Sequence, residues 1–346
     1  PAATLVLGLG AYLAPMPFPI GALFRDNVEE LPSDLASLRP IVNTLELQDA
    51  IAALRDYSLV EVAEDMIWFH PLVQSMARHS LDSKARNEWS AVVTNLLRRC
   101  FHYSPHDLTT WSSSELLFPH AWVCLDHALA AGVGAESSLE LGGHVAQFCQ
   151  MRISPQVAGH LLERLVKTFE LSIRLGSPEH VLLCAIKCEL INNLRERDCY
   201  REALTLAEHL ADEMAALPEE DQVCDLQVRL AVVRGTALLA AGQFQLALEA
   251  GRRALSLLDA HPSPARTTLL ASANGLVGLA LQNLATFPES RRHLELALAA
   301  LPESDTTGTM EWAVLQHNLG ITLTELGDIG GAERAYRLAI ERMEIM

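Results

Sequence analysis

Residues 317–340 read HNLGITLTELGDIGGAERAYRLAI, and this pattern predicts a pair of helices. Small and large apolar residues recur at helical spacing on both sides of Gly327. Glycine readily adopts the left-handed conformation that ends many helices, so Gly327 marks the turn between the two helices. The small residues Gly320 and Ala332 would allow the paired helices to pack closely.

The same spacing recurs three more times toward the N-terminus. The four sets of matching positions are Gly320, Leu323, Gly327, Ala332, Tyr336 and Ala339; Gly278, Leu281, Ala285, Ser290, Leu294 and Ala297; Gly235, Leu238, Gly242, Ala247, Gly251 and Ala254; and Ile191, Leu194, Asp198, Ala203, Ala207 and Leu210. Their first members lie 44, 43 and 42 residues apart. Proline stands at each join, at positions 178, 218, 262 and 302, where a helix has to stop.

This spacing resembles the tetratricopeptide repeat, although the period exceeds the usual length of about 34 residues. A fifth, degenerate unit is expected near Leu139–Leu171, with Pro155 in its turn. We therefore expect a mainly α fold in which residues 136–346 form a right-handed α-solenoid of tetratricopeptide repeats. Stacked helix pairs of this kind bury a continuous core and curve around a concave groove.

Residues 1–82 do not repeat and are expected to form a winged-helix-like domain. The expected elements are helices at Leu5–Ala14, Ile20–Arg25, Gln48–Arg55 and Leu72–Leu81, and a hairpin of Ser58–Val62 with Met66–Phe69. Residues 83–135 are expected to form a helical connector, with helices at Arg86–Tyr103 and Glu115–Ala131.

The winged-helix-like domain of residues 1–82, called the front domain below, resembles part of a particular class of signalling protein. Residues 53–60 read ALRDYSLV, residues 69–74 read FHPLVQ, and Leu117, Pro119 and His120 form a Leu-x-Pro-His stretch. Together with the repeats, these look like the C-terminal part of an NB-ARC/STAND (NLR-like) signal-transducing NTPase. In that family a winged helix follows the nucleotide-binding domain, and a histidine at the end of its hairpin contacts the phosphates of the bound nucleotide. His70 matches that histidine by position, and Pro71 replaces the acidic residue that usually follows it.

The resemblance implies an upstream NTPase domain in cis, with ATP or ADP bound there, and oligomerisation on activation. This chain carries no nucleotide-binding loop of its own, since such a loop needs glycines before a Lys and a Ser/Thr. Only Lys167-Thr168 has the right final pair, and Val166 precedes it. We therefore expect no catalysis and no cofactor in this chain itself. Because it begins at Pro1 rather than Met, we expect a piece of a longer protein.

The composition of the chain excludes several classes of partner and favours one cellular compartment. The chain has 26 Lys and Arg against 43 Asp and Glu, a net charge of −17, which argues against nucleic acid as a partner. Leu5–Phe24 is uncharged and long enough to span a membrane, but Pro15, Pro17 and Pro19 would break the helix, so no membrane is expected. The 7 cysteines form no CxxC pair, which favours reduced thiols and a cytoplasmic protein. No set of four convergent ligands appears at a known spacing, so no metal site is expected.

The groove is the predicted binding site, for a peptide or protein ligand. Positions on the first helix of each repeat that face the groove in this family are Glu189, Asn192, Arg195, Glu196, Arg229, Val232, Val233, Thr236, Leu239, Gln282, Asn283, His317, Asn318, Thr324 and Glu325. Asn and Gln amides both donate and accept, so they suit the backbone of an extended peptide. Such residues are also found simply solvated on an inner wall.

Two other functions stay open. A transcriptional regulator would place the winged helix on DNA, but Leu72–Leu81 offers only Arg78 and His79 as basic groups, and the hairpin is acidic. A stand-alone tetratricopeptide scaffold, in the manner of kinesin light chains, would need no front domain.

Overall fold

The computed structural model describes residues 2–20, 45–104, 108–217, 221–260, 266–301 and 310–345. The chain divides into two compact units, Pro1–Ile173 and Arg174–Met346. The predicted helix at Ile20–Arg25 lies, apart from Ile20, outside the described residues. Each unit is treated below by itself.

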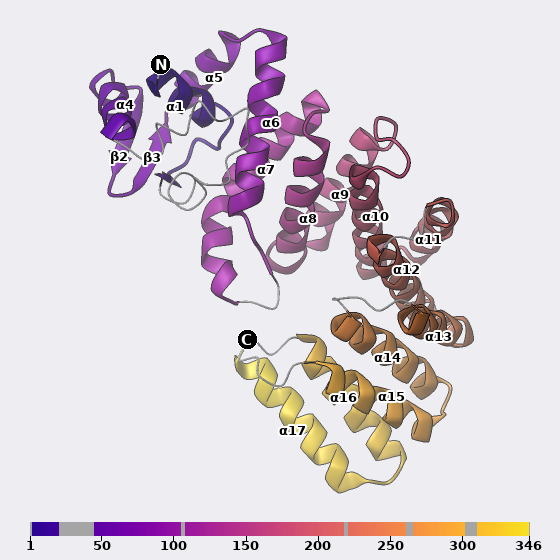
Figure 1. The fold of residues 1–346 in the computed structure, drawn as a ribbon. Coiled ribbons are helices and arrows are strands. Elements are labelled where there is room, and N and C mark those ends of the chain that lie inside the picture. Colours follow the sequence, from indigo (N-terminus) through magenta and orange to yellow (C-terminus); the bar gives the residue numbers. More distant parts are fainter. Residues whose placement is uncertain are drawn as a thin grey trace. The chain divides into compact units, whose positions relative to one another are not determined.

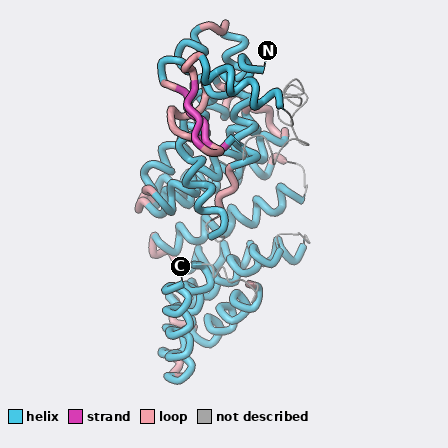
Figure 2. Tube along the Cα trace, turned by 90° about the vertical axis from the view of Figure 1, so that its left-hand side faces the viewer, coloured by secondary structure: helices cyan, strands magenta, loops and turns pink. Residues whose placement is uncertain are grey.

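The first unit combines helices with one small antiparallel sheet (Figure 1). Its helices are α1 (Ala2–Gly10), α4 (Leu45–Asp56), α5 (Pro71–His79), α6 (Ser83–Cys100), the 3-10 turn η3 (Leu108–Thr110), α7 (Trp111–Ala131), α8 (Ala135–Arg152) and α9 (Pro155–Phe169). The strands are β1 (Phe18–Pro19), β2 (Val60–Ala63) and β3 (Met66–Phe69), in the order β1-β3-β2. Figure 2 shows these strands in magenta beside the first helices, with helices and loops making up the rest of the described chain.

The predicted hairpin is confirmed, and the ring of Phe69 lies against Gly10 at the end of α1. Val60 pairs with Phe69 and Ala63 with Met66, around a turn in which Glu64 has a positive φ of 55°. β1 extends the sheet by pairing Phe18 with Ile67, which the run of alternating prolines had not indicated. The rings of Phe18 and Phe69 stack at 6.1 Å, so the sheet closes a small aromatic core.

The first helix begins and ends earlier than its sequence predicts, and a side chain contacts the chain where it ends. The expected helix ran to Ala14, whereas α1 ends at Gly10. The buried amide of Gln74 donates to the carbonyls of Gly10 at 2.9 Å and Leu13 at 3.0 Å. These bonds tie the turn after α1 to α5, in place of further helical turns.

The next two helices of the connector begin earlier than predicted, and α6 also ends earlier, at Cys100 instead of Tyr103. α6 begins at Ser83, because the carboxylate of Asp82 accepts from the Ala85 N–H at 2.8 Å and caps it. α7 begins at Trp111 and continues through Pro119. The expected degenerate pair is present as α8 and α9, and Pro155 is the first residue of α9, where a missing N–H costs nothing.

The described residues of the second unit form four antiparallel helix pairs. These are α10 (Pro178–Glu196) with α11 (Tyr200–Ala215), α12 (Asp221–Ala240) with α13 (Phe244–Ala260), α14 (Arg266–Asn283) with α15 (Phe287–Ala300), and α16 (Met310–Glu325) with α17 (Ile329–Ile345). All four predicted pairs are therefore found. No helix in the described parts of the chain combines the length and apolarity needed to cross a membrane.

Every pair turns through the same backbone geometry. In the third pair, the Thr286 N–H donates to Leu281 O at 2.9 Å and the Ala285 N–H donates to Gln282 O at 3.0 Å. This is the Schellman motif, which needs a left-handed residue after the helix. The left-handed residues are Asp198 (φ 59°), Gly242 (75°), Ala285 (57°) and Gly327 (80°), the turn positions that the repeat spacing had indicated.

Because the turn demands a left-handed residue, Ala285→Gly is expected to stabilise the second unit by about 1 kcal/mol. Gly242 occupies the equivalent position, and a Cβ added there would meet no atom of the described residues within 4 Å. Gly242→Ala should therefore destabilise by a similar amount through the backbone alone. Urea unfolding of both variants measures this. Equal effects of the same sign would contradict the assigned turn geometry.

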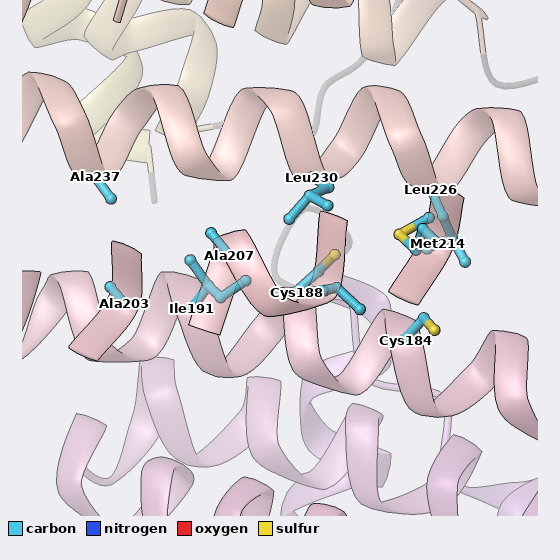
Figure 3. Packing of buried hydrophobic residues seen from close by; sticks show 10 residues of the cluster. Cys184, Cys188, Ile191, Ala203, Ala207, Met214, Leu226, Leu230 and Ala237 are labelled. Carbon is cyan, nitrogen blue, oxygen red and sulfur yellow. The ribbon is translucent and has the colours of Figure 1, made fainter. Parts of the chain in front are cut away.

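Small residues let the paired helices approach closely. Ala203, Ala247, Ser290 and Ala332 occupy the same repeat position and are all buried. Figure 3 shows one resulting cluster, in which Cys184, Cys188 and Ile191 of α10 meet Ala207 of α11 and Leu230 of α12. Clusters of this kind join each pair to the next along the described part of the second unit.

Candidate functional site

The first helices of successive pairs contact one another in the second unit. α10 packs on α12, α12 on α14, and α14 on α16, while each second helix packs on the first helix of the following pair. Helices that touch along one side in this way form the inner side of a solenoid. We call the groove-facing positions predicted on these four helices the A-helix wall. Its residues are Glu189, Asn192, Arg195, Glu196, Arg229, Val232, Val233, Thr236, Leu239, Gln282, Asn283, His317, Asn318, Thr324 and Glu325.

Two contacts join residues of the A-helix wall across neighbouring pairs. Arg229 Nη1 of α12 lies 3.9 Å from Glu189 Oε1 of α10. Gln282 Nε2 of α14 donates to the Asn318 carbonyl of α16 at 3.4 Å. Residues that are far apart in the sequence therefore share one surface at two places.

Two amides of the A-helix wall keep unused hydrogen-bonding capacity. Asn283 Nδ2 donates to Leu279 O at 2.9 Å, and Asn318 Nδ2 donates to Val314 O at 2.7 Å. Each bond uses one of the two N–H groups, and no hydrogen bond within the described residues uses either Oδ1. Each side chain can therefore still donate once and accept through its oxygen.

Other predicted residues are engaged within their own helix pair. Arg195 donates to Asn192 Oδ1 at 2.9 Å and 3.2 Å and also pairs with Glu196. The His317 ring lies 5.6 Å from that of Tyr336 on α17. Glu325 and Thr324 are exposed near the end of α16, and Thr324 donates to Gly320 O at 2.9 Å.

The apolar side chains in the middle of the A-helix wall are less accessible to a ligand than the sequence suggests. Val232, Val233 and Leu239 are half-buried, and each packs against a hydrophobic cluster between neighbouring helices. These side chains hold the array together. Arg229 remains the exposed group at this point of the wall.

His70 caps a helix in this chain. It precedes α5 with an extended backbone, and its Nδ1 accepts from the Leu72 N–H at 3.2 Å. An accepting Nδ1 leaves the proton on Nε2. The side chain is exposed, and its Nε2 forms no hydrogen bond within the described part of the chain.

The structure contains a buried polar network that the sequence analysis missed. His180 Nε2 lies 2.7 Å from Glu213 Oε1, and Lys187 Nζ donates to Glu213 Oε2 at 2.8 Å. His180 and Lys187 are each 4% exposed. Burial by itself would raise the pKa of Glu213, but the hydrogen bonds from Lys187 and His180 outweigh it and lower that pKa. His180 and Lys187 are seven positions apart, so they lie on one face of α10, but only the packing of α11 brings Glu213 to them.

The charges in this network favour an ion pair over a bound cation. Ligand atoms of His180, Cys184 and Glu213 do lie within 4.8 Å of one another. However, the Lys187 ammonium already occupies one oxygen of Glu213 and would repel a cation at this position. Desolvation raises the pKa of Cys184 to about 12, so the thiol is protonated, whereas metals bind thiolates.

The helix pairs, their common turns and the contacting first helices define a mainly α protein that carries a solenoid of tetratricopeptide-type repeats. No protein-family model matches the chain, and no curated protein matches it. Solved structures of similar fold include a signal transduction ATPase with a tetratricopeptide repeat sensor from Pyrococcus horikoshii, which is 12% identical. That match covers 100% of this chain and 51% of the ATPase, with a TM-score of 0.48.

Two other solved structures show the same kind of likeness. A putative kinesin light chain of Podosopora anserina is 21% identical over 59% of this chain and 94% of its own, with a TM-score of 0.42. A tetratricopeptide protein described as having an unusual peptide-binding site is 15% identical over 61% of this chain and 93% of its own, with a TM-score of 0.35. Since these TM-scores lie below 0.5, the class of fold rests on the helix pairs and turns of the chain itself.

Proposed function

We propose that this chain is a ligand-sensing, protein-binding module whose A-helix wall holds an extended peptide segment of a partner. The observation that carries this is the spare hydrogen-bonding capacity of Asn283 and Asn318 on neighbouring first helices. An extended peptide presents alternating N–H and C=O groups, which such amides satisfy in pairs. Arg229 and Glu189 add a charged pair on the same surface.

The front domain is proposed to pass the binding event to an NTPase domain upstream in the same polypeptide. The support is the sequence resemblance of residues 53–60 and 69–74, together with the position of His70. His70 uses Nδ1 for its cap, and its exposed Nε2–H remains able to donate to a phosphate oxygen. Ligand binding to the repeats would then shift the population between two states of the NTPase, with oligomerisation as the outcome. A stand-alone scaffold would use the same wall without that coupling.

A matched pair of double variants tests the wall. Peptides selected from a random displayed library on the purified chain would be titrated against Asn283→Ala with Asn318→Ala. Two lost hydrogen bonds at about 1 kcal/mol each should raise Kd about 30-fold. Calorimetry measures the change, and circular dichroism checks that the helices remain.

The control is Gln243→Ala with Gln245→Ala, two exposed amides at the start of the second helix of a pair. This variant should bind the selected peptides as the parent does. Unchanged binding by the Asn283 and Asn318 variant, or equal loss in the control, would remove these amides from the site.

A further inference from the structure

The first unit contains a cavity of about 480 Å³, open to solvent on one side, that is lined by α5, α6, α7 and the turn after α1. Its lining residues are Tyr12, Arg78, His79, Ser83, Arg86, Asn87, Ser90, His127, Ala130 and Ala131. A volume of this size is typical of pockets for small molecules. His70 lies at the opposite end of α5 and does not line it.

The lining is cationic, in contrast to the chain as a whole. Arg78 and Arg86 line it with two histidines, and no carboxylate is among the lining residues, although the chain carries a net charge of −17. Within the described residues, neither arginine forms an ion pair. Arg78 donates to Ala11 O, and Arg86 Nε lies 3.4 Å from Asp82 O, so several N–H groups of both guanidinium groups remain.

The positive charge of Arg78 affects the pKa of the neighbouring His127 side chain. Burial lowers the pKa of His127, and the charge of Arg78 lowers it further, against the smaller opposing effect of Asp126. Asp126 itself pairs with Arg164 at 2.6 Å, and Asp82 caps α6. Both of these carboxylates therefore have a partner outside the lining.

A buried hydroxyl in the same lining has no hydrogen-bond partner among the described residues. Ser90 is 2% exposed, and it is the Oγ of this side chain that is left unsatisfied. A helical serine usually donates to the carbonyl four residues before it. Here that carbonyl belongs to Arg86, and it accepts a hydrogen bond from the Tyr12 hydroxyl at 3.1 Å. An unsatisfied buried hydroxyl costs about 1–3 kcal/mol, so a ligand acceptor at this position would be favoured.

From this cavity we infer a binding site for a small anion that carries a phosphate group. Arginine forms strong, charge-assisted hydrogen bonds to phosphate. The donors offered by Arg78, Arg86, Ser83 and Ser90 exceed what the two oxygens of a carboxylate can use, whereas a phosphate presents more acceptor oxygens. Tyr12 and His127 add aromatic surface to the same lining, which suits the organic part of a phosphate ester.

Calorimetric titration of the full chain with inorganic phosphate, at constant ionic strength, tests this site. Saturable binding is expected, and Arg86→Gln should weaken it at least about tenfold through loss of one charge-assisted contact. Arg86 is exposed, so this variant should retain the fold. Ser90→Ala should also weaken binding, without loss of charge.

Arg55→Gln is the matched control, because Arg55 is an exposed helical arginine outside the cavity. It should bind phosphate as the parent does. Absence of saturable binding, or equal weakening by Arg86→Gln and Arg55→Gln, would overturn the proposal. A parallel titration with adenosine 5′-monophosphate separates the sources: tighter binding than inorganic phosphate assigns a nucleotide-like ester, and equal binding assigns the phosphate group alone.

Discussion

Replacing Glu213 with alanine is expected to lower the free energy of unfolding of the second unit by about 3–5 kcal/mol, the usual cost of breaking a buried ion pair. The change removes the carboxylate that accepts hydrogen bonds from His180 and Lys187, and both of these side chains are buried. Urea unfolding followed by circular dichroism measures the loss.

Glu208→Ala is the matched control, since Glu208 lies on the exposed face of the same helix. It should change stability by less than about 0.5 kcal/mol. If the two variants were equally stable, the network would contribute nothing beyond the carboxylate's own burial.

The same carboxylate makes the parent chain sensitive to acid. Because the folded-state pKa of Glu213 is lowered, its contribution is fully present above the unfolded-state pKa of about 4.3 and is lost as the pH falls through the folded-state value. The stability difference between the parent and Glu213→Gln should therefore shrink below about pH 4.3. A difference that stayed constant from neutral pH to that range and below would contradict the lowered pKa.

Gly278→Val is expected to destabilise the second unit by about 2–3 kcal/mol, through overpacking between the helices of the third pair. A Cβ at this position would stand 2.8 Å from Leu294 Cγ and 3.3 Å from the Leu294 backbone nitrogen. Leu294 is fully buried, so any shift of its side chain would disturb the packing around it. Thermal and urea unfolding measure the effect.

Gly330→Ala provides the comparison, because Gly330 is also helical but a Cβ there meets only the end of the Arg334 side chain, at 3.7 Å. Alanine is the better helix former, so this variant should gain about 0.5–1 kcal/mol. Stability changes of opposite sign for Gly278→Val and Gly330→Ala would show that Gly278 is retained for packing. If Gly278→Val were as stable as the parent, the close packing assigned to α14 and α15 at this position would be wrong.

Some features of the site follow from local spacing and others do not. Asn283 and Asn318 could be predicted as groove-facing positions because each repeat has the same register, and the Gln282–Asn318 contact follows that register. The half-buried state of Val232 and Val233 could not be foreseen, because an apolar residue at such a position suits a ligand and a neighbouring helix equally well. The cationic cavity draws Tyr12, Arg86 and His127 from three separate parts of the first unit with no shared motif.

The sequence by itself determined the repeating helix pairs and their turns. Small residues at fixed intervals set the register of each helix pair and so the position of its turn, and this local geometry depends only on neighbours within a turn or two of the chain. That is why Asp198 and Ala285 could be recognised as turn residues without being glycine. Tertiary structure alone decided which polar groups meet, such as Glu213 with Lys187, and which remain unsatisfied among the described residues, such as the Ser90 hydroxyl. Those outcomes depend on the approach of separate helices, which small differences in packing set and no short stretch of sequence encodes.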